Sequence, residues 1–335
     1  MTTQARAAIA DAAPRRWSDT LLSWEFILVL LLAGVMVMGT VLSPYFLDIW
    51  TLSDATFNFS EKAIIALPMA LLILVREIDL SVAAIISVAS LAMGLCVGFG
   101  LEPWALAIVG IMVGLVCGLF NGILVTRIGL PSIVVTIGTM SLFRGIAQVV
   151  LGDQAVTTYP KGFSSWGQGY ALKFPPVPLS FAVFLGFAVI FTLLLHKTAL
   201  GRKMFAIGNN PAAARFSGIA VDRIKLGLFA ATGALSGLAA VFLTSRIGST
   251  RPNIALGWEL EIITMVILGG VAIAGGSGSI PGVVLAAFIL GLTTLALSLI
   301  NVPGIVISVL MGLLLIGSIA APIVIRRIMS AQTRP

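Results

Sequence analysis

Apolar runs of about 20 residues recur along the whole of this chain, and they limit its fold more than any other feature. A helix of that length and composition spans the hydrocarbon core of a bilayer. Only 10% of the 335 residues are charged, whereas a typical soluble domain has about 25%. The sequence therefore predicts an all-α integral membrane protein, with no room for a separate soluble domain.

We expect about ten transmembrane helices, some of them short or interrupted. The predicted spans are residues 24–42, 61–75, 80–98, 103–125, 132–151, 178–196, 226–246, 259–274, 281–300 and 303–325. Because the number is even, both termini fall on the same side of the membrane.

The charged residues indicate which side that is, since juxtamembrane Lys and Arg mark the cytoplasmic face. The basic groups on the side of the termini are the N-terminal arginines Arg6, Arg15 and Arg16, then Arg76, Arg127, the segment 196–225, and Arg326, Arg327 and Arg334. The acids on the other side are Asp48, Asp54, Glu61, Glu102 and Asp153. We therefore predict cytoplasmic tails at 1–23 and 328–335 around one membrane domain, 24–327. Topology also accounts for the net charge of +7, so nucleic acid is not an expected partner.

The polar segment from His196 to Lys225 stands apart from the apolar sequence on either side of it. It carries six Lys or Arg residues against the single acid Asp222. Asn209 or Asn210 is suited to cap a short helix, Pro211 to its first turn and Gly218 to its end. We expect a cytoplasmic loop, 197–225, that presents this helix as a docking surface.

On the opposite side, the long segment 152–177 is rich in Gly, Pro, Tyr and Trp. Two interpretations remain open for this external loop. It is either an aromatic belt at the membrane interface or a contact surface for an external partner.

Two halves of the chain resemble each other. Segment 63–98 is apolar, polar at REIDLS and apolar again, and segment 262–300 is apolar, interrupted by GGSGS and apolar again. The spans that follow open near Pro103 and Pro303 and close on Arg-Ile. Paired, interrupted apolar segments in corresponding halves indicate a transporter built from repeats, with its pathway near the interruptions.

Polar groups close to these interruptions are candidates for a pathway or gate. Around REIDLS, Asp79 is suited to cap the next helix, and the alternative is a direct role in gating. The glycines of the second interruption, Gly269, Gly270, Gly275, Gly276 and Gly278, allow close helix packing or a re-entrant break. Arg144 needs a partner inside its span, and a pore-facing pair with Glu259 or Glu261 is a hypothesis.

Motifs for catalysis and for cofactors are missing from the sequence. No Gly-x-x-x-x-Gly-Lys-Ser/Thr phosphate loop occurs, and His196 is the only histidine. Cys96 and Cys117 lack the spacing of a disulfide or metal motif. We therefore expect no enzyme activity, no bound nucleotide or cofactor and no metal site in this chain.

Three stretches carry a resemblance to a known family: REIDLSVA (76–83), GRKMFAIGNNPAAARFSGIAVDRIK (201–225) and VILGGVAIAGGSGSIPG (266–282). The chain resembles the ribose/xylose-type carbohydrate permeases of bacterial ABC importers from about Ile64 to Arg327. Many such permeases have Gly-Gly or Gly-Glu where this chain has Arg76-Glu77. That departure, together with GSTRPNIALGWELE (248–261), is most similar to the rhamnose-transporter branch.

The resemblance implies the partners and the docking-loop residues, whereas the pathway or gate residues follow from the polar groups described above. The partners are a second permease copy or a paralogue, cytoplasmic ATPase subunits that bind ATP and Mg, a periplasmic sugar-binding protein and the lipid of the bacterial inner membrane. The docking-loop residues are Gly201, Arg202, Ala206, Gly208, Asn210, Ala213, Ala214, Arg215, Gly218 and Ile219. The expected pathway or gate residues are Glu77, Asp79, Ser81, Ser141, Arg144, Glu261, Thr264, Gly275, Gly276 and Ser277. Alternatives are a permease for another small solute (ribose, an autoinducer-type sugar or a branched-chain amino acid) or an ion-coupled transporter.

Overall fold

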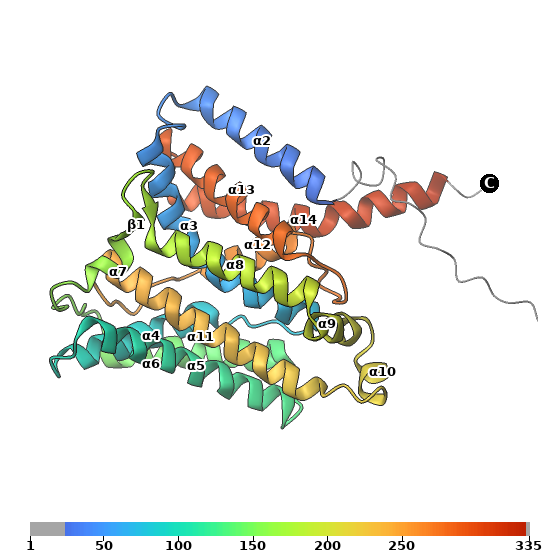
Figure 1. Ribbon diagram of the computed structural model, residues 1–335, viewed down its shortest axis with the longest axis horizontal. Helices are drawn as coiled ribbons and strands as arrows, with labels where there is room; N and C mark the ends of the chain where they lie inside the picture. Colours follow the sequence, from blue (N-terminus) through green and yellow to red (C-terminus); the bar gives the residue numbers. More distant parts are fainter. Residues whose placement is uncertain (1–23, 333–335) are drawn as a thin grey trace, which may run out of the picture.

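The computed structural model describes residues 24–332, whose regular structure is almost entirely helical (Figure 1), which confirms the all-α prediction. The helices are α2 (Trp24–Leu42), α3 (Ile49–Leu74), α4 (Val82–Val97), α5 (Pro103–Thr126), α6 (Ser132–Leu151), α7 (Ser164–Gln168), α8 (Leu179–Lys197), α9 (Ala199–Asn209), α10 (Pro211–Phe216), α11 (Val221–Ile247), α12 (Trp258–Leu268), α13 (Ile280–Leu299) and α14 (Gly304–Gln332). Two short strands, β1 (Tyr170–Leu172) and β2 (Val177–Pro178), form an antiparallel hairpin. Within the described residues, seven helices are long and apolar enough to cross a membrane, and α4 and the first part of α14 are shorter apolar helices.

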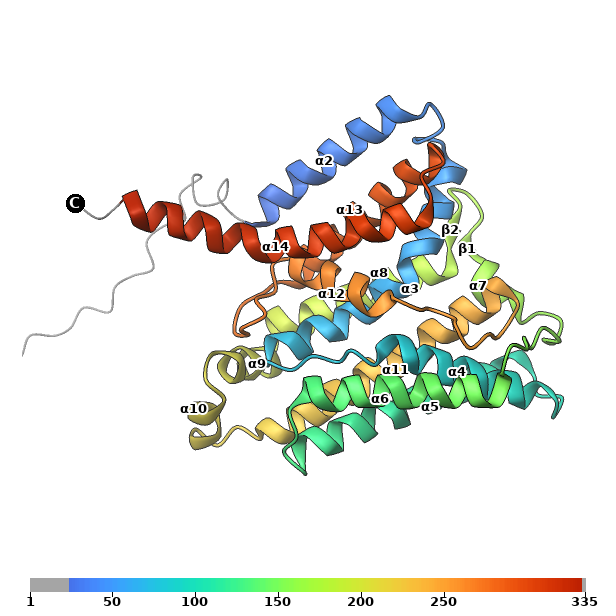
Figure 2. The same cartoon turned by 180° about the vertical axis from the view of Figure 1, so that it is seen from behind.

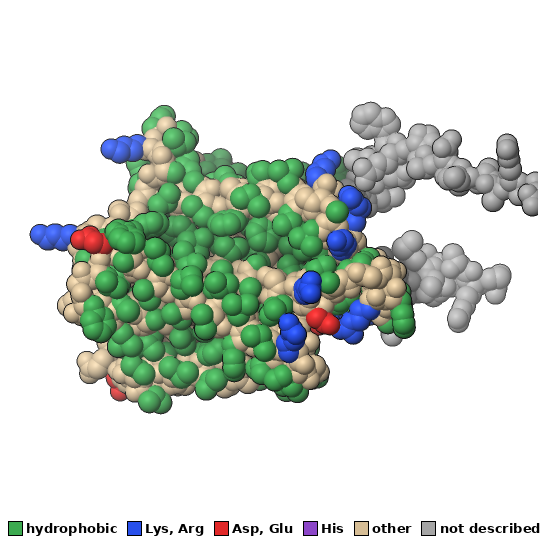
Figure 3. Space-filling model, turned by 60° about the horizontal axis from the view of Figure 1, so that its bottom comes forward, with side chains coloured by type: hydrophobic (Ala, Val, Ile, Leu, Met, Phe, Trp, Pro, Cys, Tyr) green, Lys and Arg blue, Asp and Glu red, His purple; other side chains and the backbone are tan. Residues whose placement is uncertain are grey.

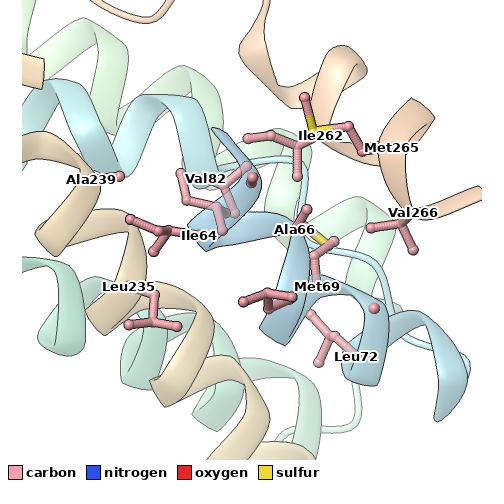
Figure 4. Close-up of a cluster of buried hydrophobic side chains, with 14 of the residues drawn as sticks. Ile64, Ala66, Met69, Leu72, Val82, Leu235, Ala239, Ile262, Met265 and Val266 are labelled. Carbon is pink, nitrogen blue, oxygen red and sulfur yellow. The ribbon is translucent and has the colours of Figure 1, made fainter. Parts of the chain in front are cut away.

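Helix α3 lies at the centre of the bundle, between α11 on one side and α12 on the other (Figure 4). Its second half is buried on every side, which is typical of a helix that is apolar all round. The side chains that meet there are Ile64, Ala66, Met69 and Leu72 of α3, Val82 of α4, Leu235 and Ala239 of α11, and Ile262, Met265 and Val266 of α12.

A seam of glycines lets α5 and α11 pack backbone to backbone. Gly110, Gly114, Gly118 and Gly122 fall every four residues on one face of α5, and Gly233 and Gly237 face them from α11. A methyl group on Gly114 would come within 2.7 Å of the Gly237 nitrogen, so no larger residue fits. Small residues at this spacing allow membrane helices to approach closely.

The two ends of the bundle differ in composition. Helices α9 and α10 lie at one end together with the start of α2 and the end of α14, and α7 with the β1–β2 hairpin lies at the other (Figures 1 and 2). Lys and Arg side chains gather at the end with α9 and α10, and an apolar face extends between the ends (Figure 3).

Both predicted interruptions are present, between α3 and α4 and between α12 and α13. Each first helix ends in the same hydrogen-bond pattern. The amides of Arg76 and Glu77 donate to the carbonyls of Ile73 and Leu72, and those of Gly270 and Val271 donate to the carbonyls of Ile267 and Val266. This is a Schellman motif, whose first residue after the cap takes a left-handed conformation. Arg76 (φ 67°) and Gly270 (φ 88°) are those residues.

Several predicted boundaries are wrong. Helix α3 begins at Ile49 rather than 61, because Asp48 caps it through the amides of Trp50 and Thr51. Asp54 and Glu61, predicted on the outer side, therefore lie inside the helix, and Glu61 is fully buried.

At the other end of the chain, α12 stops at Leu268 instead of 274, and the glycine-rich segment 269–279 follows it. Helix α14 continues to Gln332, so it includes most of the predicted tail 328–335. The predicted N-terminal tail, 1–23, lies outside the described residues, as do residues 333–335.

Candidate coupling and transport site

The helix predicted for docking is α10, and the residues expected to cap, start and end it do so. The Asn210 side chain accepts hydrogen bonds from the amides of Ala212 and Ala213, each at 3.1 Å, and Pro211 follows in the first turn. Gly218 (φ 80°) ends the helix: its amide and that of Ile219 donate to the carbonyls of Arg215 and Ala214. The loop also contains a second helix, α9, which the sequence analysis did not separate from it. Thr198 caps α9 by accepting from the amide of Gly201.

The ten docking-loop residues divide into two groups by their exposure. Those that face the bundle are buried or half-buried: Gly201, Ala206, Gly208, Ala214 and Ile219. Those that face outward are exposed: Arg202, Asn210, Ala213, Arg215 and Gly218. The loop therefore has an inner face that attaches it to the membrane helices and an outer face available to a partner.

Phe216 is the residue on this outer face that the sequence analysis missed. It closes α10 with 93% of its surface exposed, although most of its neighbours are small or polar. Beside it, the Arg215 guanidinium bonds Asp222 at 2.5 Å, and both side chains are about half exposed. The available signal was the position of Phe216 within a polar, basic segment, where a large aromatic residue stands between Arg215 and Ser217.

The inner face of the loop meets both helix interruptions at one point, which we call the three-way junction: Leu74–Glu77, Gly208–Asn209 and Gly275–Gly276. The Arg76 guanidinium donates to the carbonyls of Gly208 (2.6 Å) and Asn209 (2.8 Å). The Gly276 amide donates to the carbonyl of Leu74 at 2.9 Å. A methyl group on Gly208 would collide with the backbone of both interruptions. Helix α9 is therefore in direct contact with both interruptions.

An ion pair adds a second link on the same side. Glu77, in the first interruption, pairs with Lys225 in the first turns of α11, and both side chains are mostly buried. Helix α11 follows α10 directly in the chain, so this pair ties the interruption to the other end of the loop.

Deeper in the bundle, Asp79 and Ser81 form a buried cluster with Asn121 of α5. The Asp79 carboxylate accepts from the Ser81 amide at 2.8 Å and from the Ser81 hydroxyl at 2.6 Å. The Asn121 side chain donates to the Ser81 hydroxyl oxygen at 2.8 Å. Asp79 thus binds a backbone amide before α4 as a capping residue does, but α4 begins at Val82 rather than at Leu80.

Of the two acids proposed as partners of Arg144, Glu261 is not its partner in this structure, and Glu259 acts on Arg144 through its charge without forming an ion pair among the described residues. Arg144 donates instead to three backbone carbonyls, those of Pro252 (2.9 Å), Ile254 (2.7 Å) and Ala83 (3.3 Å). Glu261 pairs with Lys62 of α3 at 2.5 Å. Arg144 therefore holds the segment before α12 against α4, where the carbonyls of an irregular backbone satisfy its donors.

The remaining pathway candidates lie in separate places. Ser141 is exposed on α6 beside a shallow apolar groove, and Thr264 is buried and donates to the Leu260 carbonyl of its own helix at 2.7 Å. The Ser277 carbonyl accepts from the Ala272 amide inside the second interruption. The ten predicted pathway residues therefore do not form one site, and only Glu77, Gly275 and Gly276 lie at the three-way junction.

At the opposite end, the aromatic residues of segment 152–177 mostly turn inward. Phe163 is fully buried, and the ring of Tyr159 stacks on it at 4.6 Å. The Tyr159 hydroxyl bonds the Thr250 hydroxyl at 2.6 Å, and burial raises the pKa of Tyr159 to about 12. This part of the loop closes the end of the bundle, whereas Phe174 at the tip of the hairpin is exposed.

Comparisons with known proteins agree with this architecture. Residues 51–319 match the family described as branched-chain amino acid transport system / permease component. The autoinducer 2 import system permease protein LsrD of Enterobacter sp. (strain 638) is 34% identical over 301 residues, which cover 88% of this chain and 91% of the relative. The LsrD proteins of Salmonella paratyphi A (strain ATCC 9150 / SARB42) and Escherichia coli O9:H4 (strain HS) are 35% and 37% identical, each over 300 residues that cover 88% of this chain and 90% of the relative. The chain therefore belongs to the family of permease components described for branched-chain amino acid transport systems.

Proposed function

We propose that this chain is the permease subunit of an ABC importer for a small sugar, and that α9 and α10 couple it to a separate ATPase. The observation that carries the proposal is the build of the loop: an outer face with exposed Phe216 and Arg215, and an inner face clamped to both helix interruptions. The three relatives above are named as permeases of an import system, which supports the same assignment.

In the proposed mechanism, ATP-driven closure of the ATPase subunits displaces α10, and α9 moves with it. Arg76 and Gly276 transmit this displacement to the two interruptions through their hydrogen bonds at the three-way junction. The helix pairs α3–α4 and α12–α13 then shift between two arrangements that expose the pathway to opposite sides of the membrane. Nucleotide biases this equilibrium because it binds one arrangement of the assembly better than the other.

The proposal also places the chain in its surroundings. The basic end with α9 and α10 faces the cytoplasm of the bacterial inner membrane, in line with the distribution of Lys and Arg. The opposite end receives a periplasmic sugar-binding protein. A second permease copy or a paralogue completes the transmembrane part, and the partner ATPases bind ATP and Mg.

Two neutral sugars are candidate substrates, and each is supported by a different observation. The relatives named for autoinducer 2 favour an autoinducer-type sugar, and they give no support to the rhamnose branch that the sequence resembles at Arg76-Glu77. Uptake of rhamnose and of autoinducer 2 by the same reconstituted importer, each with its own binding protein, decides between them.

The coupling role is tested with Phe216→Ser and Arg215→Glu in proteoliposomes that contain the ATPase and the binding protein. An exposed aromatic side chain that anchors an interface contributes about 2 kcal/mol or more, so we expect each variant to lower ATP-driven uptake by at least about tenfold. The protein should still insert and bind its permease partner.

Phe174→Ser is the matched control, because Phe174 is also a strongly exposed phenylalanine but lies at the opposite end. Its binding of the ATPase, measured by co-purification, should equal that of the unmodified protein, whereas both docking variants should lose much of it. Normal ATP-driven uptake by both docking variants would contradict the proposal, as would uptake that continues without the ATPase.

A further inference from the structure

A cavity of about 420 Å³ with both apolar and polar side chains in its lining lies within this one chain, away from the three-way junction. It is enclosed by α3, α12, α13 and α14 and by the end of α11. The residues that line it come from the first half of α3, the last turns of α11 and α13 and the first turns of α12 and α14. This is the half of the bundle opposite α9 and α10 (Figure 2). Its volume is in the range of small-molecule sites, about 300–1,000 Å³.

Two ion pairs form one wall of the cavity. Arg246 donates to both carboxylate oxygens of Glu61, at 2.8 Å each, and to the side-chain oxygen of Asn58 at 3.0 Å. Lys62 pairs with Glu261 at 2.5 Å. Ionisable groups within membrane helices are costly and mark functional sites by default. The two cations and two carboxylates balance, so this wall suits a neutral ligand better than a charged one.

An aromatic surface and three hydroxyl groups complete the lining. Trp258 borders the cavity, and the Lys62 ammonium lies 4.9 Å from the centre of its ring. The hydroxyls of Thr294, Ser298 and Ser308 donate to carbonyls of their own helices, at 2.9, 2.8 and 3.2 Å. Each hydroxyl oxygen therefore keeps lone pairs that accept from a ligand. On the opposite wall, Lys62 and Arg246 have more N–H groups than their bonds to Glu261, Glu61 and Asn58 use.

From this arrangement we infer that the cavity binds a neutral polyhydroxylated molecule of monosaccharide size. Each hydroxyl group of such a ligand can donate and accept hydrogen bonds. It can therefore donate to the hydroxyl oxygens on α13 and α14 and accept from Lys62 on α3 and Arg246 on α11. A flat apolar face of such a molecule packs on the Trp258 ring. A zwitterion or an anion would have to disrupt one of the two ion pairs to enter. The inference rests on the proposed transport of a sugar and assigns it a binding site inside one protomer.

The test measures binding by the full-length chain in lipid nanodiscs, without ATPase, nucleotide or binding protein. Saturation-transfer difference NMR detects weak binding of three probes, D-ribose, L-rhamnose and autoinducer 2, with L-leucine as the zwitterionic comparison. We expect at least one neutral probe to bind. Thr294→Val should weaken its binding about tenfold because it removes a hydroxyl acceptor, and Glu261→Gln should do the same because it leaves the Lys62 charge unpaired in the cavity wall.

Adjacent residues supply matched controls. Thr293→Val and Glu259→Gln make the same chemical changes at positions that do not line the cavity, and they should leave binding unchanged. Thr294→Val disturbs no ion pair, so it keeps the test valid if Glu261→Gln lowers the yield of folded protein.

Absence of binding for all three neutral probes, preferential binding of L-leucine, or equal binding by the Thr294→Val and Thr293→Val variants would each overturn the inference. These results leave the proposed function standing if ATP-driven uptake persists. Conversely, uptake that needs no ATPase refutes the proposed function. That result would not affect the inference, because binding to the cavity is measured on this chain alone.

Discussion

The break between α3 and α4 and the break between α12 and α13 end their first helices with the same motif but with different chemistry. In the first break, 75–81, the left-handed position is occupied by Arg76, and charged side chains make the contacts. In the second, longer break, 269–279, Gly270 occupies that position, and further glycines bring the backbone close to its neighbours. The two breaks thus have the same backbone geometry, but the first is held by side-chain bonds and the second depends on glycines, which have no side chains.

The difference has a mechanical meaning. A non-glycine residue in the left-handed region costs about 1–2 kcal/mol, so Arg76 is retained there against an unfavourable backbone preference. Its guanidinium bonds to Gly208 and Asn209 offset that cost. The second break meets the first through its backbone, where the Gly276 amide donates to the Leu74 carbonyl, and the Trp24 side chain packs on Gly270 and donates to the Leu268 carbonyl at 2.9 Å. The first break is therefore the one whose hold on the coupling loop depends on particular side chains.

The largest effect is expected from Gly208→Ala, because that residue touches both breaks. A methyl group there would meet the backbone of Leu74 and Gly276, which cannot move aside as a side chain can. Overpacking of this kind costs about 1–3 kcal/mol and separates α9 from both breaks. We expect a lower unfolding temperature in a thermal-shift assay and loss of ATP-driven uptake.

Gly227→Ala on α11 is the control, since a methyl group there meets no atom within 4 Å. If Gly208→Ala retains full uptake, the three-way junction does not transmit the motion, and the comparison of the two breaks loses its mechanical meaning.

A smaller effect is expected from Glu77→Gln, which concerns the first break alone. The change leaves Lys225 without its charged partner. The site is mostly buried, since 13% of the Lys225 side chain and 11% of the Glu77 side chain are exposed. Loss of one partner of a fully buried pair costs about 3–5 kcal/mol, and the partial exposure of this pair and the acceptor that Gln keeps lower the expected cost to about 1–2 kcal/mol. Denaturation in mixed detergent measures the difference.

Asp222→Asn breaks the exposed pair with Arg215 and should cost less than about 1 kcal/mol. Equal destabilisation by the two changes would show that the Glu77–Lys225 pair contributes no more than a surface pair does.

The elements that the sequence predicted well are those set by neighbours along the chain. Asn210, Pro211 and Gly218 define α10 through hydrogen bonds within a few residues, and the two breaks are visible as polar or glycine-rich interruptions of apolar runs. The start of α3 was missed because its polar residues lower the local hydropathy. The fully buried acid among them, Glu61, is paired by Arg246, which lies far away in sequence.

The three-way junction could not be predicted from the sequence, because it too depends on contacts between residues far apart in the chain. It requires Leu74, Gly208 and Gly276 to meet, and nothing local to any of them indicates the other two. The choice of partner for Glu261 is similar. Arg144 and Lys62 are both cations within apolar sequence, and only the packing of α12 against α3 selects Lys62.

The smallest effect is the most specific, because it separates backbone strain from side-chain contact at Arg76. Arg76→Ala and Arg76→Gly both remove the bonds to Gly208 and Asn209, so both should weaken ATP-driven uptake. Only glycine also relieves the left-handed backbone, so Arg76→Gly should be more stable than Arg76→Ala by about 1 kcal/mol in thermal unfolding.

The counterpart in the second break is Gly270→Ala, which introduces the same strain and presses on Trp24. It should destabilise the protein while leaving the Arg76 bonds, and therefore the coupling per folded molecule, intact. If Arg76→Gly were no more stable than Arg76→Ala, the left-handed conformation would carry no cost at that position. If Gly270→Ala uncoupled uptake as strongly as Arg76→Ala, the two breaks would be equivalent in transmission as well as in geometry.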